Sequence, residues 1–226
     1  MENDFIYWRH PTPPGIKVEE VCGGDDHAGV WRDMAMQIYC ENGKDGYREV
    51  GHFASGAPFL YSDQSRISIT HTKGLLAVAT LPRTPEAEMG VFSERTALGI
   101  DAERLDRSQV LKLRERFLSP DELQMTDAED ITANIIAWTI KEALYKAALT
   151  PGLDFRSAIR IISMPELHEN PADPKAPIPV YGKGEIIFPD GTKAEMNLYS
   201  YESEGCCVTL AFSPKSATWK KHKNQN

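Results

Sequence analysis

Apolar and polar positions follow a helical period through the centre of the chain and predict a long helix over residues 127–149. Wound at about 3.6 residues per turn, this stretch gathers one apolar stripe, made of Ala133, Ile136, Ile140, Ala143, Leu144 and Ala147. The broadly opposite side carries Trp138, Glu142, Tyr145 and Lys146, with Lys141 on a flank. Because aromatic residues are uncommon on a face that meets only water, we expect this second face to line a cleft. The alternative is an ordinary surface ion pair, since Glu142 and Lys146 are four residues apart.

Pairs of residues with the spacing of a capping box mark helix starts in the same region. The pairs are Asp106 with Gln109, Ser119 with Glu122, and Thr126 with Glu129. They predict short helices over residues 107–117 and 120–125, and the third pair opens the long helix. An earlier helix is predicted over 25–40, where Gly29 interrupts the pattern.

A strand followed by a hairpin is predicted twice. The first copy turns at Lys73-Gly74 and the second at Glu204-Gly205, and in both a Phe-x-x-Gly segment comes before the two apolar runs. This repeat suggests two related halves with a boundary near residues 95–98. Glycine at a hairpin turn is common in any β protein, so the repeat could also arise without duplication.

Composition narrows the class of protein. The chain of 226 residues is 41% hydrophobic and 26% charged, and no apolar run approaches the roughly 20 residues of a membrane span. The first residues lack a basic start followed by an apolar segment, so we expect a cytoplasmic protein. A net charge of −8 argues against a general nucleic-acid binder, and an anionic ligand would need a local basic pocket. The four cysteines lack CxxC spacing, which indicates neither a zinc site nor a disulfide framework, and Cys206 and Cys207 should point to opposite faces of a strand.

Two carboxylates share one face of a predicted strand in "LGIDAERL", residues 98–105. Asp101 and Glu103 alternate with apolar residues and would lie about 6.6 Å apart along the strand. Oxygen ligands suit a hard cation, Mg²⁺ before Zn²⁺. The alternative is an edge strand that shows its polar face to solvent.

The combination of two motifs resembles a known family. "GIDAE", followed after some forty residues by "WTIKEALYKA", is similar to the signature of the 4'-phosphopantetheinyl transferases. "RFLSPDEL", "ISITHT" and "SGAPFL" also resemble segments of that family, so the likeness covers about residues 50–153. By length the chain resembles the two-halved, surfactin-synthetase-activating (Sfp) type of holo-carrier-protein synthase.

This resemblance implies an α+β fold of two similar halves, 1–96 and 97–226, related by a pseudo-two-fold axis. Each half would pack a small antiparallel sheet on a long helix, with coenzyme A in the cleft between them. The implied reaction transfers 4'-phosphopantetheine from coenzyme A to a serine of an apo acyl or peptidyl carrier protein and releases 3',5'-ADP.

The resemblance also assigns roles to residues. Asp101, Glu103 and Glu142 would bind Mg²⁺, and Lys141 and Lys146 would contact the phosphates. His71 would lie beside the 3'-phosphate of coenzyme A with Thr70 close by. Glu142, directly or through a metal-bound water, is the candidate base, which with Lys146 makes up the predicted catalytic pair.

Two nucleotide contacts of the family are replaced in this sequence. Ala57 stands where relatives often have lysine, and Ala28 and Gly29 stand where they tend to have arginine and threonine. Arg32 and Arg66 are the candidate replacements.

The helix over 107–117 is the expected docking surface for an acidic carrier, because Arg107, Lys112, Arg114 and Arg116 outnumber its one acidic residue. The alternative is a solvated basic face. A monomer is expected, and the sequence does not choose between fatty-acid, polyketide and nonribosomal-peptide carriers. Two other functions stay open: a non-catalytic relative that binds coenzyme A or carriers, and a Mg²⁺-dependent nuclease, which the acidic composition disfavours.

Overall fold

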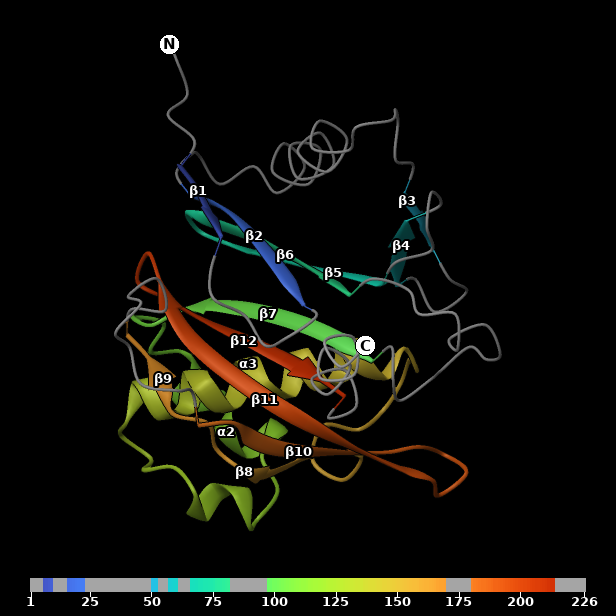
Figure 1. Ribbon diagram of the computed structural model, residues 1–226. Coiled ribbons are helices and arrows are strands. Elements are labelled where there is room, and N and C mark those ends of the chain that lie inside the picture. The colour runs from blue at the N-terminus through green and yellow to red at the C-terminus, as the bar shows by residue number, and fades with distance from the viewer. Residues whose placement is uncertain are drawn as a thin grey trace, which may run out of the picture.

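The computed structural model describes residues 6–9, 16–22, 50–52, 57–60, 66–81, 97–169 and 180–213. These residues form the expected α+β fold with antiparallel sheets, and they contain two α-helices (Figure 1). The helix predicted over 25–40, with Arg32, Ala28 and Gly29, lies outside the described residues. No helix in the described ranges is long and apolar enough to cross a membrane.

The N-terminal sheet has six strands, and every neighbouring pair is antiparallel. In spatial order the strands are β1 (Ile6–Arg9), β2 (Lys17–Cys22), β6 (Leu75–Leu81), β5 (Arg66–Thr72), β4 (Pro58–Leu60) and β3 (Val50–His52). The predicted hairpin is confirmed, because β5 and β6 pair across Lys73-Gly74. Gly74 has a φ of 80°, which an L-residue with a side chain rarely adopts.

The C-terminal sheet is built from the second half of the chain. Its main path is β7 (Leu98–Arg104), β12 (Cys206–Phe212), β11 (Lys193–Ser203), β10 (Gly182–Ile187) and β8 (Ile159–Ser163), and β9 (Leu167–His168) pairs in parallel with β11. The second predicted hairpin is also confirmed, because β11 and β12 pair across Glu204-Gly205.

The two sheets share a strand order. Without β1 and β9, the N-terminal order β2-β6-β5-β4-β3 and the C-terminal order β7-β12-β11-β10-β8 both place the first strand beside the last. A long helix is present in the C-terminal half, whereas none of the described residues before Ala97 is helical.

Three helical segments follow β7: α2 (Val110–Phe117), the 3₁₀ turn η3 (Glu122–Gln124) and α3 (Ile131–Ala148). The Ser119–Glu122 capping box is confirmed, because each backbone amide donates to the other side chain, at 2.7 and 3.3 Å. It opens only one 3₁₀ turn, so the helix predicted over 120–125 was too long.

The other two predicted caps were wrong, because their side chains have different partners. Asp130, not Thr126, caps α3, and its carboxylate accepts from the Ala133 amide at 3.0 Å. Asp106 accepts from the Arg104 guanidinium at 3.1 Å instead of capping α2. Both helices therefore begin about one turn later than predicted.

The C-terminal sheet lies between α3 and the N-terminal sheet, as Figure 1 shows. Side chains of β12 alternate between these layers. Cys207 and Ala211 pack in the cluster with α3, whereas Cys206, Val208 and Leu210 pack with β2 and β6. The prediction that the adjacent cysteines face opposite ways is confirmed. Both faces of β12 are therefore buried, one against α3 and the other against the N-terminal sheet. β7 pairs with β12 and lies between the same two layers.

Candidate functional site

A close approach between β7 and α3 positions the candidate site. Gly99 lies directly under the helix, and a Cβ placed there would stand 1.9 Å from the Ala143 carbonyl oxygen and 2.8 Å from the Ala147 amide nitrogen. Only glycine on the strand, facing alanines on the helix, permits this packing. The contact places Asp101 and Glu103, two and four residues further along the same face of β7, beside the polar side of α3.

Asp101 is the centre of the site. Its Oδ1 accepts from the Lys146 ammonium at 2.8 Å and from the Thr70 hydroxyl at 3.1 Å. Its Oδ2 is buried and has no hydrogen-bond partner in the described part of the chain. Burial raises the pKa of Asp101, and the nearby charge of Glu103 adds to this, while Lys146 opposes it. A buried carboxylate oxygen without a partner is costly, and it is the kind of atom that a cation would satisfy.

Lys146 joins the two sheets at this point. Besides Asp101, its ammonium donates to the backbone carbonyls of Ile100 in β7 at 3.0 Å and Ile69 in β5 at 3.4 Å. The side chain remains 30% exposed. Its ammonium therefore occupies the junction of the two sheets.

Glu142 lies one helical turn before Lys146 and is half-buried. Burial raises its pKa most, and the charges of Asp101 and Glu103 raise it further against the opposing effect of Lys146. Its carboxylate has no hydrogen bond to any residue that the structure describes. Asp101 and Glu103 share one face of β7, and Glu142 is on the helix that packs against this strand. We call these three residues the carboxylate cluster.

Glu103 is held at the rim of this cluster. Its Oε1 accepts from the Arg107 guanidinium and from the Trp138 indole nitrogen, the latter at 3.3 Å. Trp138 and Tyr145 both stack on Phe155, with ring centroids 6.2 and 5.3 Å apart. The second face of α3 is thus half-buried, and its place in a cleft stays a prediction. Its aromatic members pack on Phe155, and its charged members turn toward β7.

Asp101 and Glu142 offer individual carboxylate oxygens of the kind that Mg²⁺ binds. In the described ranges no three His, Cys, Asp or Glu side chains already form a metal-binding group. Mg²⁺ does not require such a cage, because proteins usually hold it through one or two carboxylates, with waters and substrate phosphates as the other ligands. The unpartnered Asp101 Oδ2 and the Glu142 carboxylate meet that requirement.

Lys141 does not join the cluster, contrary to its predicted contact with coenzyme A. Its side chain is fully buried, and the ammonium donates to both oxygens of Glu122 at 2.7 Å and to the carbonyls of Phe155 and Ile159. These acceptors use all three protons. The physical reason is its place on α3, about 140° around the axis from Lys146. The sequence did not predict Glu122 as the partner of Lys141. Its only prediction for Glu122 was the capping box with Ser119.

The N-terminal half contributes Thr70 directly. Thr70 is buried, and its hydroxyl lies between Asp101 and the Ala102 amide. His71, the next residue of β5, is exposed, because adjacent strand residues face opposite ways. Arg66, the expected substitute for a family contact, is buried at the start of β5, and burial lowers its pKa to about 10. Ala57 is half-buried just before β4.

The basic face expected on the 107–117 segment is smaller than its charges suggest. Arg114 turns inward and donates to Asn134 Oδ1 at 3.1 Å and to the Thr126 carbonyl at 2.8 Å. Arg107 is paired with Glu103. Lys112 and Arg116 are exposed. The basic surface of α2 therefore consists of Lys112 and Arg116. Arg107 lies just before the helix and is engaged with Glu103.

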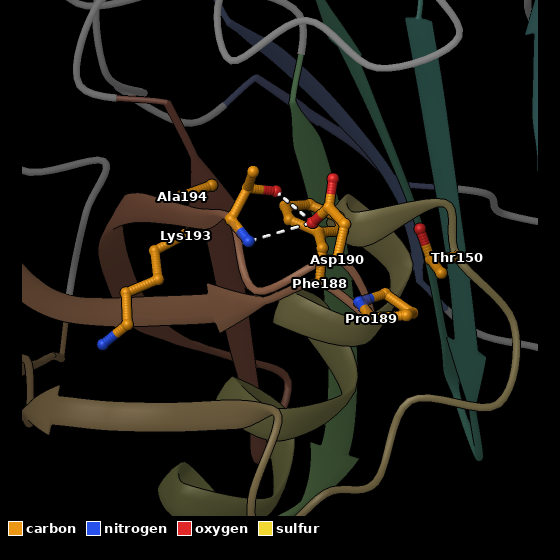
Figure 2. A pocket seen from close by; sticks show the side chains of 7 residues that line it. Thr150, Phe188, Pro189, Asp190, Lys193 and Ala194 are labelled. Atoms are coloured by element: carbon orange, nitrogen blue, oxygen red, sulfur yellow. Dashed lines mark hydrogen bonds between the residues drawn. The ribbon is translucent and has the colours of Figure 1, made fainter.

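A surface pocket lies apart from the cluster, at the turn between β10 and β11 (Figure 2). It is lined by Thr150, Phe188, Pro189, Asp190, Thr192, Lys193 and Ala194. Asp190 is its one carboxylate, and it accepts from the amide and the hydroxyl of Thr192 at 2.9 and 2.6 Å. That carboxylate therefore stabilises the turn.

A family model matches the part of the chain that contains the carboxylate cluster. No curated protein is significantly similar to the chain in sequence. Residues 97–180 match the family model of the 4'-phosphopantetheinyl transferase superfamily, and this span contains Asp101, Glu103, Glu142 and Lys146.

Proposed function

We propose that the protein transfers 4'-phosphopantetheine from coenzyme A to a serine hydroxyl of an apo acyl or peptidyl carrier protein and releases 3',5'-ADP. One observation carries the proposal: the Asp101–Lys146 pair stands where the two sheets meet, with Glu142 near it and with no hydrogen-bond partner for Asp101 Oδ2 among the described residues. This places opposite charges at one junction, and a pyrophosphate and its cation need both. The family match over residues 97–180 supports a transferase of this superfamily.

Mg²⁺ is the cofactor that we propose, held by Asp101 and Glu142 with Glu103 at the rim. When bound, it would neutralise and orient the pyrophosphate of coenzyme A. Lys146 contributes a positive charge beside the same phosphates, and its contacts with two backbone carbonyls fix its position. Because charge builds on the leaving phosphate as the bond breaks, such preorganised cations stabilise the transition state.

Glu142 is the base that we propose for the serine hydroxyl. A serine proton must leave as the oxygen attacks phosphorus, and a carboxylate with a raised pKa accepts it more readily than an ordinary one. Its carboxylate has no hydrogen bond within the described part of the chain, which leaves its oxygens available.

We further propose the two-halved architecture, with units 1–96 and 97–226 related by a pseudo-two-fold axis. The shared strand order of the two sheets supports a duplication. Coenzyme A would then lie at the junction of the sheets, with its nucleotide toward His71, Arg66 and Arg32. The buried Lys141 is left out of this contact set.

The carrier is proposed to dock on α2 through Lys112 and Arg116. Both are exposed, and carriers are usually acidic, so their contact should raise the rate of association. Lys112→Glu should raise KM for the carrier without changing KM for coenzyme A. Lys193→Glu makes the same charge change at the β10–β11 turn and serves as the control. Equal effects of the two variants would refute docking on α2.

The central experiment incubates the protein with coenzyme A, Mg²⁺ and apo carriers from fatty-acid, polyketide and nonribosomal-peptide synthesis. Intact-mass measurement should show the addition of one phosphopantetheine group to at least one carrier. Glu142→Gln should abolish the addition, whereas Glu129→Gln, which alters an exposed glutamate before α3, should not. Binding of coenzyme A without transfer to any carrier would refute the proposed reaction in favour of a non-catalytic relative.

A further inference from the structure

Two hydroxyls of β5 bind the backbone of β7 across the junction of the sheets. The Ile100 amide donates to Ser68 Oγ at 3.0 Å, and the Ala102 amide donates to Thr70 Oγ1 at 3.1 Å. Both hydroxyls are buried, and on each strand the two residues are two positions apart. β7 is the edge strand of its sheet, so some of its backbone amides have no partner strand on one side. The hydroxyls of Ser68 and Thr70, from the N-terminal sheet, accept from two of these amides.

Only one of these hydroxyls also reaches a side chain of the carboxylate cluster. Thr70 Oγ1 lies 3.1 Å from Asp101 Oδ1. A hydroxyl has one proton and two lone pairs. Since the Ala102 amide is itself a donor, the lone pair of Thr70 faces that amide, and the proton is directed to Asp101. The proton is therefore used within the protein and is not offered to a phosphate.

This bond limits how Asp101 can turn. Oδ1 receives one hydrogen bond from Thr70 and another from Lys146. Rotation of the carboxylate would break both bonds in a buried place. Oδ2 is thereby held in one direction, and it is the oxygen without a partner among the described residues.

We propose that Thr70 is a positioning residue: it orients Asp101 so that Oδ2 faces the cation, and through it the N-terminal half completes the cation site of the C-terminal half. This inference rests on the proposed function. Thr70 lies outside the residues 97–180 that match the family model. It also replaces the role in coenzyme A binding that the sequence suggested for this residue.

A purely structural role makes a different prediction. If Thr70 only satisfied the Ala102 amide, its loss should resemble the loss of the Ser68 hydroxyl, which satisfies the Ile100 amide in the same way. Ser68 lies on the same strand and is likewise buried, and no hydrogen bond joins it to the carboxylate cluster among the described residues. Ser68→Ala is therefore the matched control.

The test measures Mn²⁺ binding to the full chain without coenzyme A, by the loss of the free-ion signal in electron paramagnetic resonance. Mn²⁺ serves as the probe because it accepts the same oxygen ligands as Mg²⁺. Removal of a residue that orients a metal ligand typically weakens affinity about 10- to 100-fold, and we expect this range for Thr70→Val. Thr70→Ser, which keeps the hydroxyl, should restore binding, and Ser68→Ala should bind as the wild type does.

Several results would overturn the proposal. The proposal fails if Thr70→Val binds Mn²⁺ as tightly as the wild type does. It also fails if Thr70→Ser binds Mn²⁺ as weakly as Thr70→Val, or if Ser68→Ala loses as much Mn²⁺ affinity as Thr70→Val. Circular dichroism verifies folding, and Thr70→Ala replaces Thr70→Val if the valine variant does not fold. If the wild type neither binds Mn²⁺ nor modifies a carrier, the proposed function fails and the inference fails with it. If the wild type does both and Thr70→Val binds Mn²⁺ equally well, the inference alone fails.

Discussion

The Lys141 ammonium lies 2.7 Å from both carboxylate oxygens of Glu122, in an ion pair whose side chains are 0% and 3% exposed. Glu122 also accepts from the Ser119 and Ile161 amides at 2.7 and 2.6 Å. The pair thus connects α3 to the segment after α2 and to β8. It holds the helix that carries Glu142 and Lys146.

The Lys141–Glu122 pair predicts opposite outcomes for two lysines on one helix. Lys141→Met leaves Glu122 buried with an uncompensated charge, so we expect a loss of about 3–5 kcal/mol in the free energy of unfolding. Lys146→Met should cost less, because its ion pair is partly exposed, and should abolish transfer. Urea denaturation measures the first effect and carrier modification the second. A Lys141→Met variant as stable as the wild type would contradict this account.

Gly99→Ala tests the close approach of β7 and α3. The added Cβ would meet the backbone carbonyl of Ala143, so the strand and helix must move apart. We expect a loss of about 1–3 kcal/mol in unfolding free energy, the range for overpacked cores, together with reduced transfer. Thermal and urea denaturation provide the measurement.

Gly184→Ala is the matched control for this variant. Its Cβ would meet the methyl groups of Leu144 at 2.8 and 2.9 Å and the Arg160 carbonyl oxygen at 3.3 Å. The closest atoms belong to a side chain, which gives way more easily than backbone. If both variants lose the same stability, the backbone clash at Gly99 is not the cause.

The metal-free protein should lose stability as the pH rises through the raised pKa values of Asp101 and Glu142. Burial raises the pKa of Asp101 and Glu142, so the folded state still binds protons at a pH where the unfolded chain has released them. Where the folded state binds more protons, the free energy of unfolding falls as pH increases. Urea denaturation from about pH 4 upward, above the ordinary pKa of a carboxyl group, should show this decline. A variant combining Asp101→Asn and Glu142→Gln should show a smaller decline, and an unchanged one would contradict the assignment.

Added Mg²⁺ should have the opposite dependence on pH. A cation binds the deprotonated carboxylates and competes with the protons that the raised pKa values retain. The increase in Tm on adding Mg²⁺ should therefore be larger near pH 8 than near pH 5. An increase in Tm that does not vary with pH would place the cation elsewhere.

Tyr201→Phe tests a second polar link between the sheets. The hydroxyls of Tyr201 and Ser203 in β11 both donate to the buried carboxylate of Glu20 in β2, the latter at 2.6 Å. Loss of one donor to a buried charged group should cost about 1.5–3 kcal/mol in unfolding free energy. Tyr181→Phe removes the hydroxyl of a half-buried tyrosine and should change stability little. Equal effects in urea denaturation would argue against a special role for Glu20.

Local patterns in the sequence determined much of the fold. The apolar stripe of α3 is buried as its period predicted, except at Ala133, which is half-buried. Both hairpins turn where glycine takes a positive φ. Asp101 and Glu103 share a face of β7 because side chains alternate along any strand. These features depend on residues close in sequence, whose geometry the backbone period sets.

Only the tertiary structure decided which charged groups meet. Lys141 and Lys146 both lie off the apolar stripe of one helix, yet one packs against Glu122 and the other against Asp101, because different segments cover the two sides of α3. Thr126 and Asp106 had the spacing of caps but found partners elsewhere in Arg114 and Arg104. Thr70 meets Asp101 across 31 positions of the chain. A polar side chain bonds to whichever complementary group is nearest once the chain is folded, and spacing along the sequence does not contain that information.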